Sequence, residues 1–150
     1  MTLLDEERTA TQDDKITYTT RTHATGGRDN GAFRSSDGHL DVKLAPPPPE
    51  PARIGINPEQ LFAAGWSARF ERAVGLVAHR WKIALPAGRA VDAEVNLRIG
   101  DGGYVLSARL SVSLPGIERA VAQALVHEAQ QICPYSKATR GNIDVAIQLV

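Results

Sequence analysis

Cysteine is nearly absent from this sequence: Cys133 is the only cysteine among 150 residues. A single cysteine cannot form a disulfide within the chain, and it rules out a structural zinc site built on two or more cysteines. We therefore expect no structural metal and no cofactor. The scarcity of cysteine fits a reducing compartment, so we assign the protein to the cytoplasm.

Excess charge and long apolar runs are also missing. Seventeen basic and seventeen acidic residues give a formal net charge of zero, which leaves no bulk charge to hold a nucleic acid or an anionic membrane. No apolar run approaches the ~20 residues that a membrane-spanning helix needs. The first fifteen residues carry acids where a signal peptide has bases. We expect neither a nucleic-acid nor a membrane partner.

The composition is that of a folded domain. Hydrophobic residues make up 43% and charged residues 23% of the chain, and a chain of this length buries about two-thirds of its unfolded surface. Residues 1–14 are polar and lack apolar periodicity, so we read them as a mobile extension. The remainder, 15–150, is expected to form one domain.

Two amphipathic helices are predicted. Asn57, Pro58 and Glu59 supply an N-cap, a proline at the first helical position and an acid in the first turn of a helix that runs to about Arg80. The second helix runs from Ile117 to about Cys133, where Pro134 favours a helix end. The apolar stripe of the first helix contains Phe62, Trp66, Phe70, Ala73 and Val77.

Strands are predicted between and around these helices. Alternating residues indicate strands at 16–21, 39–44, 91–99, 104–114 and 143–150, with a four-residue turn at 100–103. The prolines at 46–49 mark an exposed loop. This order of elements predicts an α+β fold.

Arg69 is the residue that does not fit its surroundings. It follows Trp66 by three positions and precedes Ala73 by four, which places it on the apolar stripe. A buried guanidinium needs a partner such as Glu59, a ligand anion or a thiolate. The alternative is that Arg69 reaches solvent at the edge of the helix. From the residues alone, Cys133 is an inert buried thiol and Glu59 serves the helix dipole.

Several segments together resemble the organic hydroperoxide resistance branch of the Ohr/OsmC family. The resemblance runs from about residue 15 to 150. It rests on Ala24-Thr25-Gly26-Gly27-Arg28-Asp29, Ser35-Ser36-Asp37-Gly38, Leu40-Asp41-Val42-Lys43-Leu44, Asn57-Pro58-Glu59-Gln60-Leu61-Phe62-Ala63-Ala64-Gly65 and Cys133-Pro134-Tyr135-Ser136-Lys137-Ala138-Thr139-Arg140-Gly141-Asn142. It implies an intertwined homodimer of antiparallel sheets wrapped around two central helices per subunit, with sites at the interface. Members of that branch are thiol peroxidases that reduce organic hydroperoxides and are recycled by dihydrolipoamide-type reductants.

The resemblance also implies roles for individual residues. Arg28 matches the arginine that activates the peroxidatic thiolate, Glu59 the carboxylate that orients it, and Cys133 the resolving cysteine. The family pattern places the peroxidatic cysteine where this chain has Arg69. Arginine is neither nucleophilic nor deprotonable at accessible pH, so the family's two-cysteine cycle cannot run here as written.

Three functions remain open at this point. In the first, the dimer pocket binds or transforms an apolar organic oxyanion without a cysteine nucleophile. Arg28, Arg69 and Glu59 would carry the site, and its apolar walls would be Phe33, Phe62, Trp66 and Phe70. In the second, Cys133 sustains a weak one-cysteine hydroperoxide reductase. In the third, the chain is a non-catalytic partner of an intact paralogous subunit.

Overall fold

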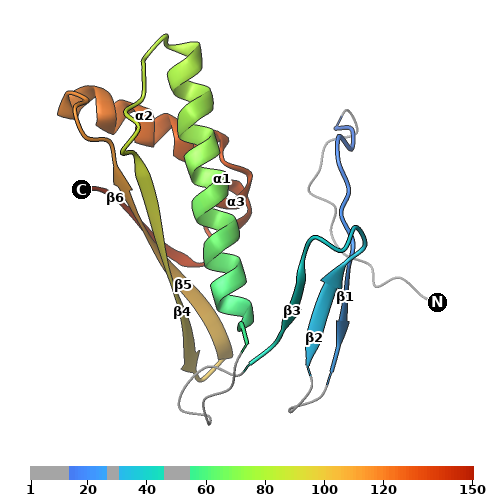
Figure 1. Ribbon diagram of the computed structural model, residues 1–150. Helices are drawn as coiled ribbons and strands as arrows, with labels where there is room; N and C mark the ends of the chain where they lie inside the picture. The colour runs from blue at the N-terminus through green and yellow to red at the C-terminus, as the bar shows by residue number, and fades with distance from the viewer. Residues whose placement is uncertain (1–13, 27–30, 46–54) are drawn as a thin grey trace. The chain divides into compact units, whose positions relative to one another are not determined.

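The computed structural model of the protein describes residues 14–26, 31–45 and 55–150 (Figure 1). The chain divides into two compact units, Met1–Leu44 and Ala45–Val150, and each unit is described by itself. Except for Asp14, the predicted extension 1–14 lies outside the described residues, as do Arg28 and the prolines at 46–49.

The N-terminal unit is a three-stranded antiparallel sheet of β1 (Thr22–Thr25), β2 (Ala32–Ser35) and β3 (Asp41–Lys43). Its central strand places Phe33 opposite Ala24 on one side and Val42 on the other. The prediction of a strand at 16–21 is wrong, because the first strand of the sheet begins at Thr22. Ile16 and Tyr18 are 85% and 73% exposed, so the apolar face of the alternating segment is not covered by any described part of the chain.

A hydrogen-bonded turn joins β2 to β3. The Ser35 hydroxyl donates to Asp37 Oδ1 at 2.5 Å, and the backbone N–H of His39 donates to the same oxygen at 3.0 Å. These bonds, led by that from Ser35, lower the pKa of the Asp37 carboxyl. Gly38 has a φ of +77°, a conformation that glycine adopts without a steric penalty.

The C-terminal unit begins with α1 (Pro58–Arg80). The Asn57 side chain accepts a bond from the Gln60 backbone N–H, and the Gln60 side chain accepts one from the Asn57 backbone, both at 2.9 Å. This capping box confirms the predicted helix start. The buried residues of α1 are Trp66, Phe70, Ala73, Val74, Val77 and Ala78.

The second sheet holds β4 (Ala90–Gly100), β5 (Gly103–Ser113) and β6 (Asp144–Leu149), in that order. β4 and β5 form the predicted hairpin, but Gly100 pairs with Gly103, so its turn has two residues rather than four. β6 runs parallel to β5, which makes this sheet mixed and not purely antiparallel. The reason is the crossover through two helices, which returns the chain in the same direction.

The crossover consists of α2 (Arg119–Ile132) and α3 (Pro134–Thr139). Pro134 ends the first helix as predicted, because Cys133 takes an extended conformation with ψ of 121°. The same proline then occupies the start of α3, a helix that the sequence analysis did not foresee.

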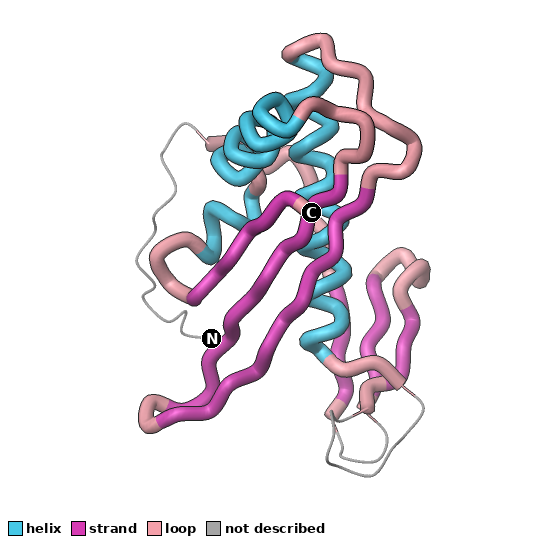
Figure 2. Tube along the Cα trace, turned by 90° about the vertical axis from the view of Figure 1, so that its left-hand side faces the viewer, coloured by secondary structure: helices cyan, strands magenta, loops and turns pink. Residues whose placement is uncertain are grey.

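The core of the C-terminal unit lies between the helices and one face of the sheet (Figure 2). α1 packs against β4 and α2, and α2 also contacts β6. The largest fully buried side chains are Trp66, Phe70, Val74, Val77, Leu110, Val112, Leu125 and Cys133. The three helices and two sheets of the described residues, in this order along the chain, confirm the α+β class.

Candidate functional site

Glu59 lies in the first turn of α1 and borders a groove between that helix and β4. The groove has a volume of about 510 Å³, and Ala63, Ala93, Val95 and Leu97 are among its lining residues. The Glu59 side chain is half-buried. In the described part of the chain it makes no hydrogen bond or ion pair. Its carboxylate therefore borders a partly apolar groove and has no cationic partner among the described residues.

Arg69 lies on α1 ten positions after Glu59, which is ~15 Å along the helix axis. At 100° per residue the two positions point about 80° apart. Arg69 is exposed, because it stands at the edge of the apolar stripe formed by Trp66 and Ala73. Its guanidinium bonds to none of the described residues. The structure thus does not bring Arg69 and Glu59 together within one chain.

Cys133 is fully buried and free. It joins α2 to α3 and belongs to the same hydrophobic cluster as Trp66 and Phe70. Its backbone N–H donates to the Ala129 carbonyl at 2.9 Å. Within the described residues no hydrogen bond joins its sulfur to Arg69. The thiol is therefore shielded from reagents in solution.

α3 contacts α1 at Gly65, one turn before Arg69. A Cβ at Gly65 would lie 3.2 Å from Tyr135 Cε2 and 3.5 Å from the Tyr135 hydroxyl oxygen. Tyr135 is 37% exposed. The sequence analysis missed this residue, because α3 was not predicted and the contact joins segments far apart in sequence.

The four predicted pocket aromatics occupy different environments. Trp66 and Phe70 are fully buried, so in the single chain they belong to the core and present no wall to a ligand. Phe62 is half-buried and meets Trp66 edge to face, with 5.6 Å between ring centroids. The Trp66 Nε1 and the Ser136 Oγ are buried and have no hydrogen-bond partner among the described residues.

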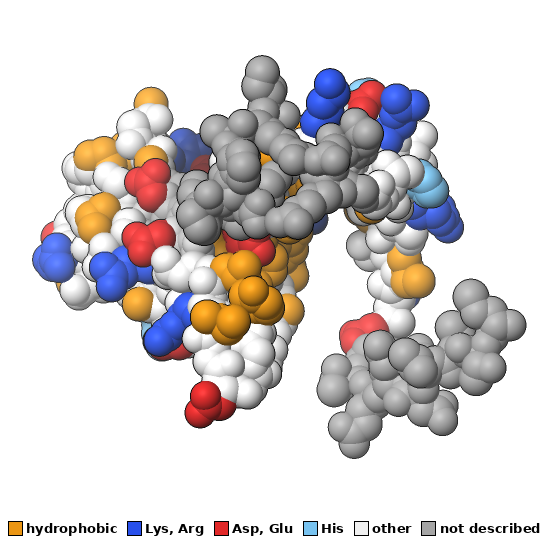
Figure 3. Space-filling model, turned by 90° about the horizontal axis from the view of Figure 1, so that it is seen from below, with side chains coloured by type: hydrophobic (Ala, Val, Ile, Leu, Met, Phe, Trp, Pro, Cys, Tyr) orange, Lys and Arg blue, Asp and Glu red, His pale blue; other side chains and the backbone are white. Residues whose placement is uncertain are grey.

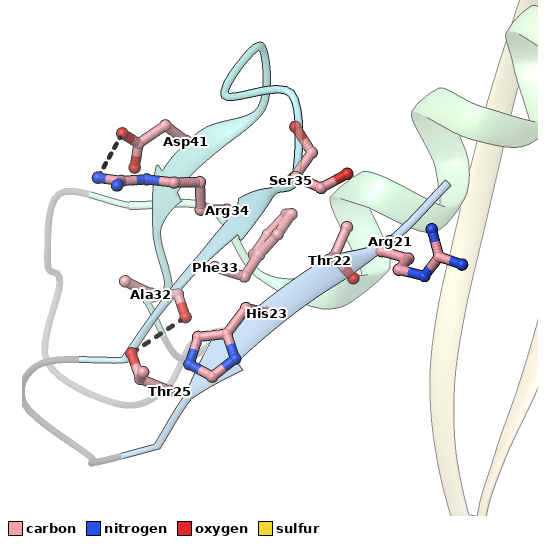
Figure 4. Close-up of a pocket in the computed structure, with 10 residues that line it drawn as sticks. Arg21, Thr22, His23, Thr25, Ala32, Phe33, Arg34, Ser35 and Asp41 are labelled. Carbon is pink, nitrogen blue, oxygen red and sulfur yellow. Dashed lines mark hydrogen bonds and ion pairs between the residues drawn. The ribbon is translucent and has the colours of Figure 1, made fainter. Parts of the chain in front are cut away.

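Phe33 lies in the N-terminal unit, where it lines a cleft of about 480 Å³ together with Arg21 and His23 (Figure 4). The cleft is bordered by the ion pair between Arg34 and Asp41, at 3.0 Å. Strands β1 and β2 supply most of its walls. Arg28, which the resemblance assigns to the site, lies outside the described residues.

Apolar side chains remain exposed where the β4–β5 hairpin ends. Ile99 and Tyr104 pair across the two strands and are 73% and 71% exposed. The view from below shows hydrophobic side chains gathered on this face of the molecule (Figure 3). An exposed apolar surface of this kind is typical of a protein interface.

The described residues contain no group of three or more His, Cys, Asp and Glu side chains that could hold a metal ion. Nor do they include a helix whose length and apolar content would suit a membrane crossing.

Comparison with known proteins places this arrangement in a family. Residues 49–148 match the OsmC-like protein family. The chain is 44% identical over 138 residues to an organic hydroperoxide resistance protein of Xanthomonas axonopodis pv. citri (strain 306), covering 91% of this chain and 96% of that protein.

Comparison with solved structures supports the same family assignment. The crystal structure of the organic hydroperoxide resistance protein OhrB of Bacillus subtilis superposes with a TM-score of 0.83 at 40% identity, covering 90% of this chain and 100% of that one. An organic hydroperoxide resistance protein from Elizabethkingia anophelis, with crystallant-derived thiocyanate bound, gives 0.84 at 40% identity, covering 91% and 98%. The chain therefore belongs to the OsmC-like family and is a relative of the organic hydroperoxide resistance proteins.

Proposed function

We propose that this protein is a diverged organic hydroperoxide resistance relative whose site binds an apolar organic oxyanion without a cysteine nucleophile. Arg69, Arg28 and Glu59 carry the site: the arginines hold the anion, and Glu59 serves as counter-charge or proton acceptor. The site is completed in a homodimer, because within one chain Glu59 and Arg69 lie ~15 Å apart along α1.

The observation that carries this proposal is the state of the only thiol. Cys133 is fully buried, and no second cysteine is available to form a disulfide with it. A two-cysteine peroxidase cycle oxidises one thiolate to a sulfenic acid, which a second thiol then resolves as a disulfide. One chain with one cysteine cannot complete that cycle.

The chemistry of Arg69 supports the binding role. A guanidinium presents five N–H donors in a planar fork and matches carboxylate and phosphate oxygens in pairs. Because Arg69 is exposed and bonds to none of the described residues, its donors are available to a ligand. In the family pattern this position holds the peroxidatic cysteine, so a ligand here would occupy the place where a hydroperoxide is reduced.

Two alternatives give different experimental results. A residual peroxidase that uses Cys133 would require the core around Trp66 and Phe70 to open before a peroxide could reach the sulfur. A non-catalytic partner of a paralogous subunit would bind no small oxyanion through Arg69. Neither alternative is favoured by a contact in the described part of the chain.

The catalytic test measures reduction of cumene hydroperoxide with dihydrolipoamide as reductant. We expect the wild type and Cys133→Ser to show no turnover above the rate without protein. Arg69→Cys should gain measurable turnover if Arg28, Glu59 and Cys133 keep the family arrangement. Rapid wild-type turnover that is lost in Cys133→Ser would overturn the proposal in favour of the residual peroxidase.

The binding test uses octanoate as a probe in isothermal titration calorimetry. We expect Arg69→Met to weaken octanoate binding by about tenfold, as befits a lost charge-assisted hydrogen bond. Arg98→Met is the matched control, since Arg98 is also exposed and lies on β4. Equal octanoate affinity in the wild type and Arg69→Met would contradict the proposed role of Arg69.

A further inference from the structure

A second arginine stands beside Arg69 on the open face of α1. Arg72 follows Arg69 by three positions and is exposed as well. Side chains three apart on a helix are neighbours, with ~5–6 Å between their Cβ atoms. Residues that precede the two arginines by one turn, Gly65 and Ala68, are small, so long side chains leaning toward the helix N-terminus have room to lie there.

No acid among the described residues neutralises this pair of arginines. Arg72, like Arg69, makes no hydrogen bond or ion pair with any described residue. The nearest acid in sequence, Glu71, is held by Arg89, whose Nε lies 2.7 Å from Glu71 Oε1. α3, which contacts α1 at Gly65, contains no acid and adds Lys137. Among the described residues of one chain, no acid therefore pairs with either of the two adjacent guanidiniums.

Tyr135 supplies a third donor at the end of this row. Its hydroxyl oxygen lies 3.5 Å from where a Gly65 Cβ would be, next to the turn toward which the Arg69 side chain leans. The hydroxyl has no hydrogen-bond partner among the described residues. Tyr135 on α3 and the two arginines on α1 thus supply three donors, none of which is bonded to a described residue, near successive turns of α1.

We propose that Arg72 is a specificity-determining residue of the oxyanion site and that, with Arg69, it selects a doubly charged headgroup of the phosphate-monoester type. This inference rests on the proposed function and adds the charge class of its ligand. A phosphate monoester carries between about −1.5 and −2 charge at neutral pH and offers three acceptor oxygens. A carboxylate or a sulfate monoester carries one negative charge and leaves one arginine uncompensated.

The test compares two probes of the same length and similar headgroup shape, octyl phosphate and octyl sulfate, below their aggregation concentrations and at constant ionic strength. We expect the wild type to bind octyl phosphate about tenfold or more tightly than octyl sulfate. Arg72→Gln should lose most of that preference while still binding octyl sulfate. Arg98→Gln should keep it. Tyr135→Phe should weaken binding of both probes severalfold.

The outcomes separate this inference from the proposed function. If the wild type shows no preference for octyl phosphate over octyl sulfate, or if Arg72→Gln keeps the wild-type preference, the proposed role of Arg72 is wrong. In either case the proposed function is still supported if octanoate binds to the wild type and binds more weakly to Arg69→Met. If the wild type binds none of the three probes, both the proposed function and the role of Arg72 are wrong. Thermal unfolding of each variant checks that the fold is retained, which we expect because the substituted side chains are exposed.

Discussion

At the scale of single residues, Arg69 and Cys133 have environments opposite to those that the roles implied by the family resemblance would require. Position 69 is exposed and holds a cation, whereas Cys133, the only cysteine in the sequence, is enclosed by hydrophobic side chains. The spacing from Trp66 and Ala73 placed Arg69 on the apolar stripe. Spacing alone cannot resolve the edge of a stripe from its centre, because neighbouring helical positions differ by only a fraction of a turn.

The burial of Cys133 leads to a direct prediction about its reactivity. We expect the native protein to react with Ellman's reagent on the order of 100-fold more slowly than the same protein in denaturing urea, because the thiol is reached only when the core opens. The measurement is the rate of thiolate release at 412 nm, with free cysteine as the control for reagent quality. A native rate equal to the denatured rate would show that the sulfur is accessible.

At the scale of secondary-structure elements, the contact between α1 and α3 depends on a glycine. A side chain at Gly65 would press on the Tyr135 ring at 3.2 Å, whereas nothing lies within 4 Å of a Cβ at Gly75 on the same helix. The two glycines carry the same intrinsic helical cost, since each is about 1 kcal/mol less favourable than alanine in a helix interior. They differ only in what surrounds them.

This difference predicts that replacing glycine by alanine changes stability differently at the two positions. Gly75→Ala should raise the free energy of unfolding by about 1 kcal/mol, while Gly65→Ala should gain clearly less or lose stability because Tyr135 must move. In a Tyr135→Ala background, Gly65→Ala should recover the full gain. Urea unfolding of the wild type, the three single variants and the Gly65→Ala/Tyr135→Ala double variant measures these differences in stability. Equal gains at both glycines in the wild-type background would show that the contact with Tyr135 carries no cost.

Local signals predicted some of these elements well and others poorly. Asn57 and Pro58 fixed the start of α1, and Pro134 the end of α2, because caps and prolines act on neighbouring residues. The strand at 16–21 was wrong, since alternation does not reveal whether a partner strand exists. The parallel pairing of β6 was not foreseen, because it depends on where α2 and α3 return the chain. The same limit applies to the candidate site: Tyr135 contacts Gly65, which lies 70 residues away in the sequence, and no local pattern reveals that contact.

At the scale of the whole molecule, the exposed apolar surface points to association. Leu97, Ile99 and Tyr104 extend the inner face of the hairpin beyond the core and remain 46–73% exposed. The family resemblance implies a homodimer, and burying this surface against a second copy would supply a hydrophobic contribution to it.

We therefore expect an obligate homodimer. Sedimentation velocity at micromolar concentration should give a mass about twice the 16.1 kDa of one chain, and Ile99→Glu should shift the distribution toward the monomer. Glu94→Gln, on the opposite face of the same strand, serves as the control that should leave the dimer intact. A stable, folded wild-type monomer at that concentration would contradict this expectation.

The parallel pairing of β6 with β5 also has a consequence for the order in which the C-terminal unit assembles. The β4–β5 hairpin closes between Gly100 and Gly103, so its strands can zip from a short loop within microseconds. β6 pairs residues as distant as Ser107 and Asp144, and this pairing must bear the entropy of closing a loop that contains both helices. The hairpin is thus a natural early nucleus and β6 a late addition. The folding rate should accordingly be limited by this long-range closure and not by formation of the hairpin.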